Sequence, residues 1–154
     1  MGIKLLWRHK MQAKQMKNYI AESRPVYNAK ASISSASDIA DELKEMQGLN
    51  KEHFVAVYLD SSNRVLKKET ISIGTLNQSM VHPREVYAPA FKTDGIASII
   101  VAHNHPGGVC EPSREDIVVT KRLHEAGKIL GIELLDHIII VKDGFVSLKD
   151  LEHL

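Results

Sequence analysis

Residues 96–116 read IASIIVAHNHPGGVCEPSRED, and this stretch contains the main determinants of the fold. Residues 96–102 form an apolar run rich in β-branched side chains, which predicts a buried strand. Pro106, Gly107 and Gly108 then break the strand and turn the chain. Residues 113–130 carry apolar side chains at helical spacing, and Gly131 supplies the stop. A strand, a Gly/Pro loop and a helix therefore follow one another directly.

The rest of the chain predicts more strands and helices in a mixed order. Further strands are expected at 54–59, 64–74, 132–141 and 145–148, the first two forming a hairpin around the turn cluster 60–63. Further helices are expected at 12–23, 37–46 and 83–93, with Ser37 capping the second and Pro83 early in the third. The order β–β–α–β–α–β–β predicts an α/β fold, a mixed sheet flanked by helices.

Composition limits the class of protein. The chain has 154 residues, 44% hydrophobic and 25% charged, enough to bury one domain core. Its single cysteine, Cys110, excludes an intramolecular disulfide framework and a multi-cysteine zinc site. No apolar run approaches the roughly 18 residues that span a membrane, and residues 1–8 are too short and basic for a signal peptide. We therefore expect a cytoplasmic protein without a membrane partner.

Charge is distributed unevenly along the chain. The net charge is +1, but residues 1–30 carry seven Lys/Arg and one acid, so this arm is +6 and the remainder −5. Residues 1–30 could contact nucleic-acid phosphates or an acidic partner. The alternative is that they form a solvated, partly helical extension without such a partner. We expect two regions: a basic N-terminal extension over 1–48, with a short helix and the connector 24–36, and a domain over 49–154.

His103 and His105 follow the buried strand two positions apart. Residues at this spacing project to the same side of an extended chain, so both imidazoles can converge on one ion. Ser113 and Asp116 share one face at the start of the next helix. Two histidines and an aspartate leave a fourth position open, which is typical of catalytic zinc. Taken separately, the histidines also suit a surface loop, and Ser113 with Asp116 an ordinary helix cap.

The spacing His-x-His, seven residues, Ser-x-x-Asp resembles the JAB/MPN (JAMM) metalloprotease superfamily. The fuller string around it, with residues 74–76, 81–86 and 135–139, resembles the RadC-like branch, in order from about residue 50 to 148. The resemblance implies the JAB/MPN architecture, which is cytidine-deaminase-like. Full-length members carry a helix-hairpin-helix DNA-binding region before this domain, and about 50 residues are too few for it. The short form resembles stand-alone RadC-like proteins of mobile elements and prophages.

The resemblance also implies roles for individual residues. His103, His105 and Asp116 would bind one Zn²⁺ per chain, and Ser113 would donate a hydrogen bond to the oxyanion. Glu52, just before the first strand, matches the glutamate that serves as general base and acid. Glu85 is the rival for that role, although it suits a structural contact with Arg84 better. Cys110 is expected to be an exposed bystander, because the pattern does not ask for a cysteine there.

Two other histidines have structural explanations. His82 is expected to cap the helix that begins at residue 83 or to pack against it. His137 lies in an apolar strand, which favours a hydrogen-bonded core histidine. The alternative for His137 is an orienting contact to a metal ligand, with Asp136 as a partner.

Three functions remain in view. The first is a zinc-dependent hydrolase of amide or isopeptide bonds, acting on an unidentified protein or peptide. The second is a DNA-associated accessory protein of a mobile element or repair system, with a structural or vestigial zinc site and a phosphate-binding arm. A metal-dependent nuclease ranks below both, because one His-His-Asp site lacks the paired metals common in such enzymes.

Overall fold

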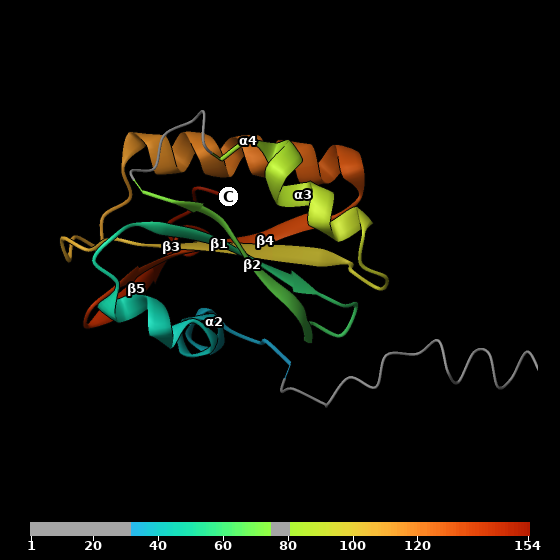
Figure 1. Ribbon diagram of the computed structural model, residues 1–154. Coiled ribbons are helices and arrows are strands. Elements are labelled where there is room, and N and C mark those ends of the chain that lie inside the picture. The colour runs from blue at the N-terminus through green and yellow to red at the C-terminus, as the bar shows by residue number, and fades with distance from the viewer. Residues whose placement is uncertain (1–31, 75–80) are drawn as a thin grey trace, which may run out of the picture.

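The fold is a five-stranded mixed sheet covered by helices on both faces (Figure 1). A computed structural model describes residues 32–74 and 81–154. The strand order is β2-β1-β3-β4-β5, with β3 and β4 parallel and the other neighbours antiparallel. Helices α3 (Pro83–Phe91) and α4 (Arg114–Leu130) cover one face, and α2 (Ala36–Glu42) covers the other. The predicted mixed α/β architecture is confirmed.

The strands lie close to their predicted positions. They are β1 (His53–Leu59), β2 (Val65–Ile73), β3 (Ser98–Asn104), β4 (Glu133–Val141) and β5 (Gly144–Ser147). The main difference is at β3, which starts and ends two residues later than predicted, so His103 lies within the strand rather than after it. The reason is that β1 and β4 pair with β3 as far as His103 and Asn104 respectively.

The N-terminal cap of α2 differs from the prediction. Ser35, not Ser37, is the cap: its side chain accepts from the backbone N of Asp38, whose carboxylate accepts from Ser34 and Ser35. This reciprocal arrangement is a capping box. The helix ends at Glu42, and a 3₁₀ helix, η1 (Lys44–Gly48), completes the predicted segment. The helix predicted over residues 12–23 lies outside the described residues.

Two hydrophobic cores lie on opposite faces of the sheet. Alternating residues of β1 separate them, with Phe54, Ala56 and Tyr58 in the core under α3 and α4 and the residues between them in the core under α2. Ile39, Leu43 and Met46 complete that second core. The sequence places residues 36–48 in the N-terminal extension, but their apolar side chains pack into the core of the sheet domain. No helix in the described ranges is both long and apolar enough to cross a bilayer.

Gly127 permits the close packing of α4 against its neighbours. A Cβ atom there would lie 2.5 Å from the Tyr87 hydroxyl and 2.6 Å from the Ile132 carbonyl oxygen. The Tyr87 hydroxyl also donates to the Leu123 carbonyl oxygen at 2.9 Å, which ties α3 to α4. The position of α4 over the sheet thus depends on the absence of a side chain at Gly127.

Gly127→Ala is expected to lower the free energy of unfolding by about 1 kcal/mol. Overpacking costs about 1–3 kcal/mol, and it outweighs the roughly 1 kcal/mol that alanine gains over glycine in a helix. Urea denaturation measures the change. Gly48→Ala is the matched control, because a Cβ there meets no atom within 4 Å and the change should stay within about 0.5 kcal/mol. Equal stability of the two variants would contradict this packing argument.

Candidate metal centre

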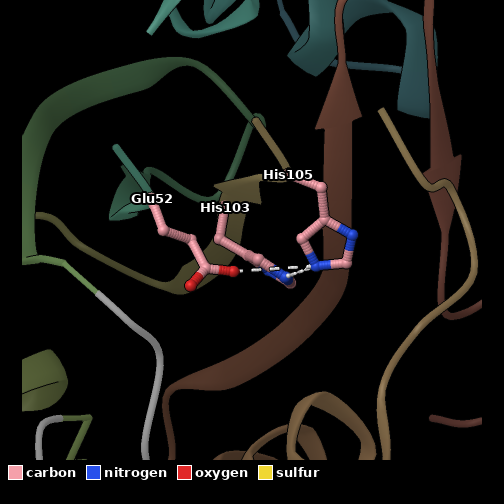
Figure 2. A group of neighbouring side chains, drawn as sticks. All are labelled: Glu52, His103 and His105. Atoms are coloured by element: carbon pink, nitrogen blue, oxygen red, sulfur yellow. Dashed lines mark hydrogen bonds and ion pairs between the residues drawn. The ribbon is translucent and has the colours of Figure 1, made fainter. Parts of the chain in front are cut away.

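The candidate site lies where three segments of the chain meet. His103 is the penultimate residue of β3, and His105 follows in the loop. Asp116 lies in the first turn of α4, and Glu52 directly precedes β1. Figure 2 shows Glu52 and both histidines pointing toward one another. Their ligand atoms all lie within 4.8 Å of one another, so this group could hold a metal ion.

Asp116 lies beside both histidines, on the side of the cluster that faces α4. Its carboxylate oxygens lie 3.2 Å from Nε2 of His103 and 3.6 Å from Nε2 of His105. Glu52 Oε1 lies 3.8 Å from Nε2 of His105. The structure therefore brings the three predicted ligands and the predicted base into one cluster, and their individual roles remain predictions.

The cluster is buried on one side and open on the other. The side chains of His103 and Asp116 are 0% and 2% exposed, whereas those of His105 and Glu52 are 16% and 19% exposed. His105 and Glu52 also line a cavity of about 600 Å³, together with Ile73 and Val109. A molecule in that cavity would reach the cluster from the side of Glu52 and His105.

The hydrogen bond of His105 determines what the cluster can bind. Its Nδ1 lies 2.6 Å from the Val109 carbonyl oxygen, and because a carbonyl only accepts, Nδ1 must carry the proton. In the neutral ring, Nε2 then presents a lone pair, and it lies 2.9 Å from Nε2 of His103 with the Asp116 carboxylate beside both. This set of nitrogens and carboxylate oxygens requires a cation, either a proton or a metal ion.

Ionisation in the cluster follows the same logic. Burial acts to raise the pKa of Asp116, but hydrogen bonds from His103 and His105 outweigh it and hold that pKa well below its usual range. The hydrogen bond to Asp116 raises the pKa of His105, against the opposing effect of burial. The cluster thus favours an ionised carboxylate and a bound positive charge.

Ser113 is the N-cap of α4. Its hydroxyl oxygen accepts from the backbone N of Asp116 at 3.1 Å, and its own backbone N donates to the Asp116 carboxylate at 2.7 Å. Ser113 and Asp116 therefore form a capping box as well as flanking the cluster. A hydroxyl that accepts one hydrogen bond keeps its proton as a donor, so the cap is compatible with the predicted oxyanion contact.

Asn104 is a residue that sequence reasoning missed. It is buried, and its side chain accepts from the backbone N of His53 at 2.8 Å and donates to the Lys51 carbonyl at 3.0 Å. These two bonds straddle Glu52, whose own carbonyl accepts from Gly74 N at 2.8 Å. Asn104 thereby places Glu52 beside the histidines. Asn104 lies between His103 and His105 in the sequence, and this position could have identified it.

The remaining candidates lie as follows. Nδ1 of His82 accepts from the backbone N of Arg84 at 3.1 Å, which confirms it as the cap of α3. Glu85 contacts Arg84 at 3.1 Å on the surface, and Cys110 is exposed, as expected. The ring of His137 contacts His103.

The suggested partnership of Asp136 with the His137 ring is wrong. The Asp136 carboxylate accepts instead from the backbone N atoms of His137 and Lys149 and from the Ser147 hydroxyl. Both ring nitrogens of His137 have other partners, His103 and Thr120. Burial nevertheless raises the pKa of Asp136 above its ordinary value.

Comparison with known proteins identifies relatives along most of the chain. A UPF0758 protein of Geobacillus sp. (strain WCH70) is 56% identical over 129 residues, which is 83% of this chain and 57% of the relative. UPF0758 proteins of Bacillus mycoides (strain KBAB4) and Bacillus cereus (strain G9842) are 54% and 55% identical with the same coverage. The chain thus spans less than two thirds of the length of these curated relatives.

The family profile described as the RadC-like JAB domain matches residues 33–153. This range contains the whole sheet, α2 with its docked side chains, and every residue of the cluster. The match and the 54–56% identities agree with the fold and with the motif that spans β3 and α4. The chain belongs to the RadC-like JAB domain family.

Proposed function

We propose that this domain is a zinc-dependent hydrolase of amide or isopeptide bonds in a protein or peptide. The observation that carries the proposal is the donor set, two imidazole nitrogens and carboxylate oxygens, at the mouth of a cavity. His103, His105 and Asp116 would hold the ion, which matches the nitrogen and carboxylate ligands of catalytic zinc. When bound, zinc polarises a carbonyl and lowers the pKa of a coordinated water.

Glu52 is placed to move a proton. It lines the cavity and its carboxylate lies 3.8 Å from Nε2 of His105, so it can accept a proton from the attacking water and return it to the leaving amine. Ser113 supplies the remaining donor, because its hydroxyl proton can stabilise the negative charge that develops on the carbonyl oxygen. Asn104 and Gly74 hold the backbone around Glu52, which would keep its carboxylate beside the cavity.

Metal content tests the ligand assignment. After zinc reconstitution, elemental analysis should find about one zinc per chain in the wild type, and almost none in His103→Ala or His105→Ala, because each variant removes a nitrogen donor. Glu85→Gln serves as the control, since the Glu85 carboxylate is exposed and contacts Arg84 on the surface. A wild-type protein that holds no zinc after reconstitution contradicts the assignment.

Asp116→Asn and Glu52→Gln distinguish the third ligand from the base. The proposal expects Asp116→Asn to weaken zinc binding strongly, whereas Glu52→Gln should keep one zinc. With peptide, isopeptide and DNA substrates, only the amide-containing ones should be cleaved, and Glu52→Gln should lose at least about 10²-fold in turnover. If Glu52→Gln loses the metal and Asp116→Asn retains it, the two roles are exchanged. DNA cleavage that needs the same residues would favour a nuclease.

The charge asymmetry supports a second candidate, a DNA-associated accessory protein. Seven Lys/Arg in residues 1–30 would contact phosphates, and this mode of binding weakens steeply as salt rises. Replacement of these seven residues by Gln in the full chain should lower DNA affinity and flatten its salt dependence. Fluorescence anisotropy with a labelled duplex, measured from low to high salt, makes the comparison. Unchanged affinity in the substituted chain, or no binding at low salt, would contradict this candidate.

A further inference from the structure

His137 is a fully buried histidine that the proposed hydrolysis does not use. It lies on β4 under α4, and both nitrogens of its ring have close partners. Nε2 lies 2.8 Å from Nδ1 of His103, and Nδ1 lies 2.6 Å from the Thr120 hydroxyl. The ring thus connects a candidate metal ligand to the body of the helix that carries Asp116.

The Thr120 hydroxyl determines which atoms donate in this chain of hydrogen bonds. Its oxygen lies 2.6 Å from the Asp116 carbonyl oxygen as well as 2.6 Å from Nδ1 of His137. A carbonyl oxygen only accepts, so the single hydroxyl proton must lie toward it. The Thr120 oxygen then accepts on its other side, and Nδ1 of His137 must carry a proton.

The same reasoning continues to His103. His137 is buried between two uncharged groups, a hydroxyl and an imidazole, and burial without a carboxylate partner on the ring disfavours the charged form. The neutral ring with a proton on Nδ1 has a lone pair on Nε2. Nδ1 of His103 must therefore donate to it, which leaves Nε2 of His103 as the atom that faces His105 and Asp116.

We propose that His137, oriented by Thr120, is a positioning residue that keeps the ring proton of His103 on Nδ1 and presents its Nε2 lone pair to a metal ion. This inference rests on the proposed metal site. His105 reaches the same state by a separate route, through the Val109 carbonyl. Partners that orient ligand histidines in this way commonly contribute 10- to 100-fold to metal affinity.

Phe54 holds both rings in place. Its ring stacks on His103 with centroids 6.1 Å apart at 15°, and contacts the His137 edge with centroids 5.4 Å apart at 69°. Phe54 is itself buried, so it packs against both imidazoles from inside the core. These contacts support the ring positions in which the hydrogen bond forms.

Nuclear magnetic resonance of the metal-free wild type tests the inference directly. Long-range ¹H–¹⁵N correlation spectra of histidine-labelled protein should show His137 protonated on Nδ1 and His103 keeping its proton on Nδ1. His103 protonated on Nε2 alone would overturn the inference. This measurement needs no variant and no activity, so it does not depend on the proposed hydrolysis.

A pair of Thr120 variants tests the effect on metal binding. Thr120→Val removes the hydroxyl at nearly constant volume and should weaken zinc binding about 10- to 100-fold in competition with a chromophoric chelator. Thr120→Ser keeps the hydroxyl and should bind nearly as tightly as the wild type. Ile39→Val controls for a general loss of stability, because Ile39 is buried in the core under α2 on the other face of the sheet and its loss of a methylene should leave zinc affinity unchanged below the unfolding range.

The outcomes separate this inference from the proposed function. Thr120→Val that binds zinc as tightly as the wild type would overturn the role of the Thr120–His137 pair while leaving the hydrolase proposal standing. Weak binding in both Thr120 variants and in Ile39→Val would also overturn it, because the loss would then follow stability alone. A wild type that binds no zinc would overturn the metal site, whatever tautomer His103 adopts.

Discussion

The parallel pairing of β3 with β4 is the constraint on which the rest of the molecule depends. Parallel neighbours need a crossover, and here α4 supplies it by running back over the sheet. The first turn of α4 must therefore lie beside the carboxyl end of β3. That single connection brings Asp116 to His103 and His105, and it lays Thr120 over His137. Sites in open α/β sheets commonly form at this end of the strands.

The hydrogen bonds around the cluster orient the groups proposed to bind a metal ion. Each histidine gives its Nδ1 proton to a partner that points away from the cluster, and the Asp116 carboxylate is kept ionised. Two imidazole nitrogens and a carboxylate face one another in the cluster, so it favours a bound cation, and the two cores on either side of the sheet hold its residues together.

The spacing of residues along the sequence was sufficient to predict most of the strands and helices and the three candidate metal ligands. His-x-His at a strand end and Ser-x-x-Asp at a helix start are short-range patterns, so the convergence of His103, His105 and Asp116 could be expected from residue order alone. The contribution of His137 could not, because Thr120 and His137 meet only once α4 has crossed the sheet. Asn104 was missed for a similar reason, since its partners lie about fifty residues away in the sequence, at the start of the neighbouring strand β1. The choice between Ser35 and Ser37 as cap depended on side-chain contacts that propensity does not resolve.

The separation of the cluster residues along the chain has a consequence for the unfolded state. Glu52, His103 and Asp116 belong to three segments that are close only in the folded domain. An ion bound by all three would link these segments reversibly and offset part of the entropy lost when the loops between them close. Ligand binding to the native state alone adds stability in proportion to the logarithm of ligand concentration. The free energy of unfolding of this domain would then rise with the concentration of the ion around it.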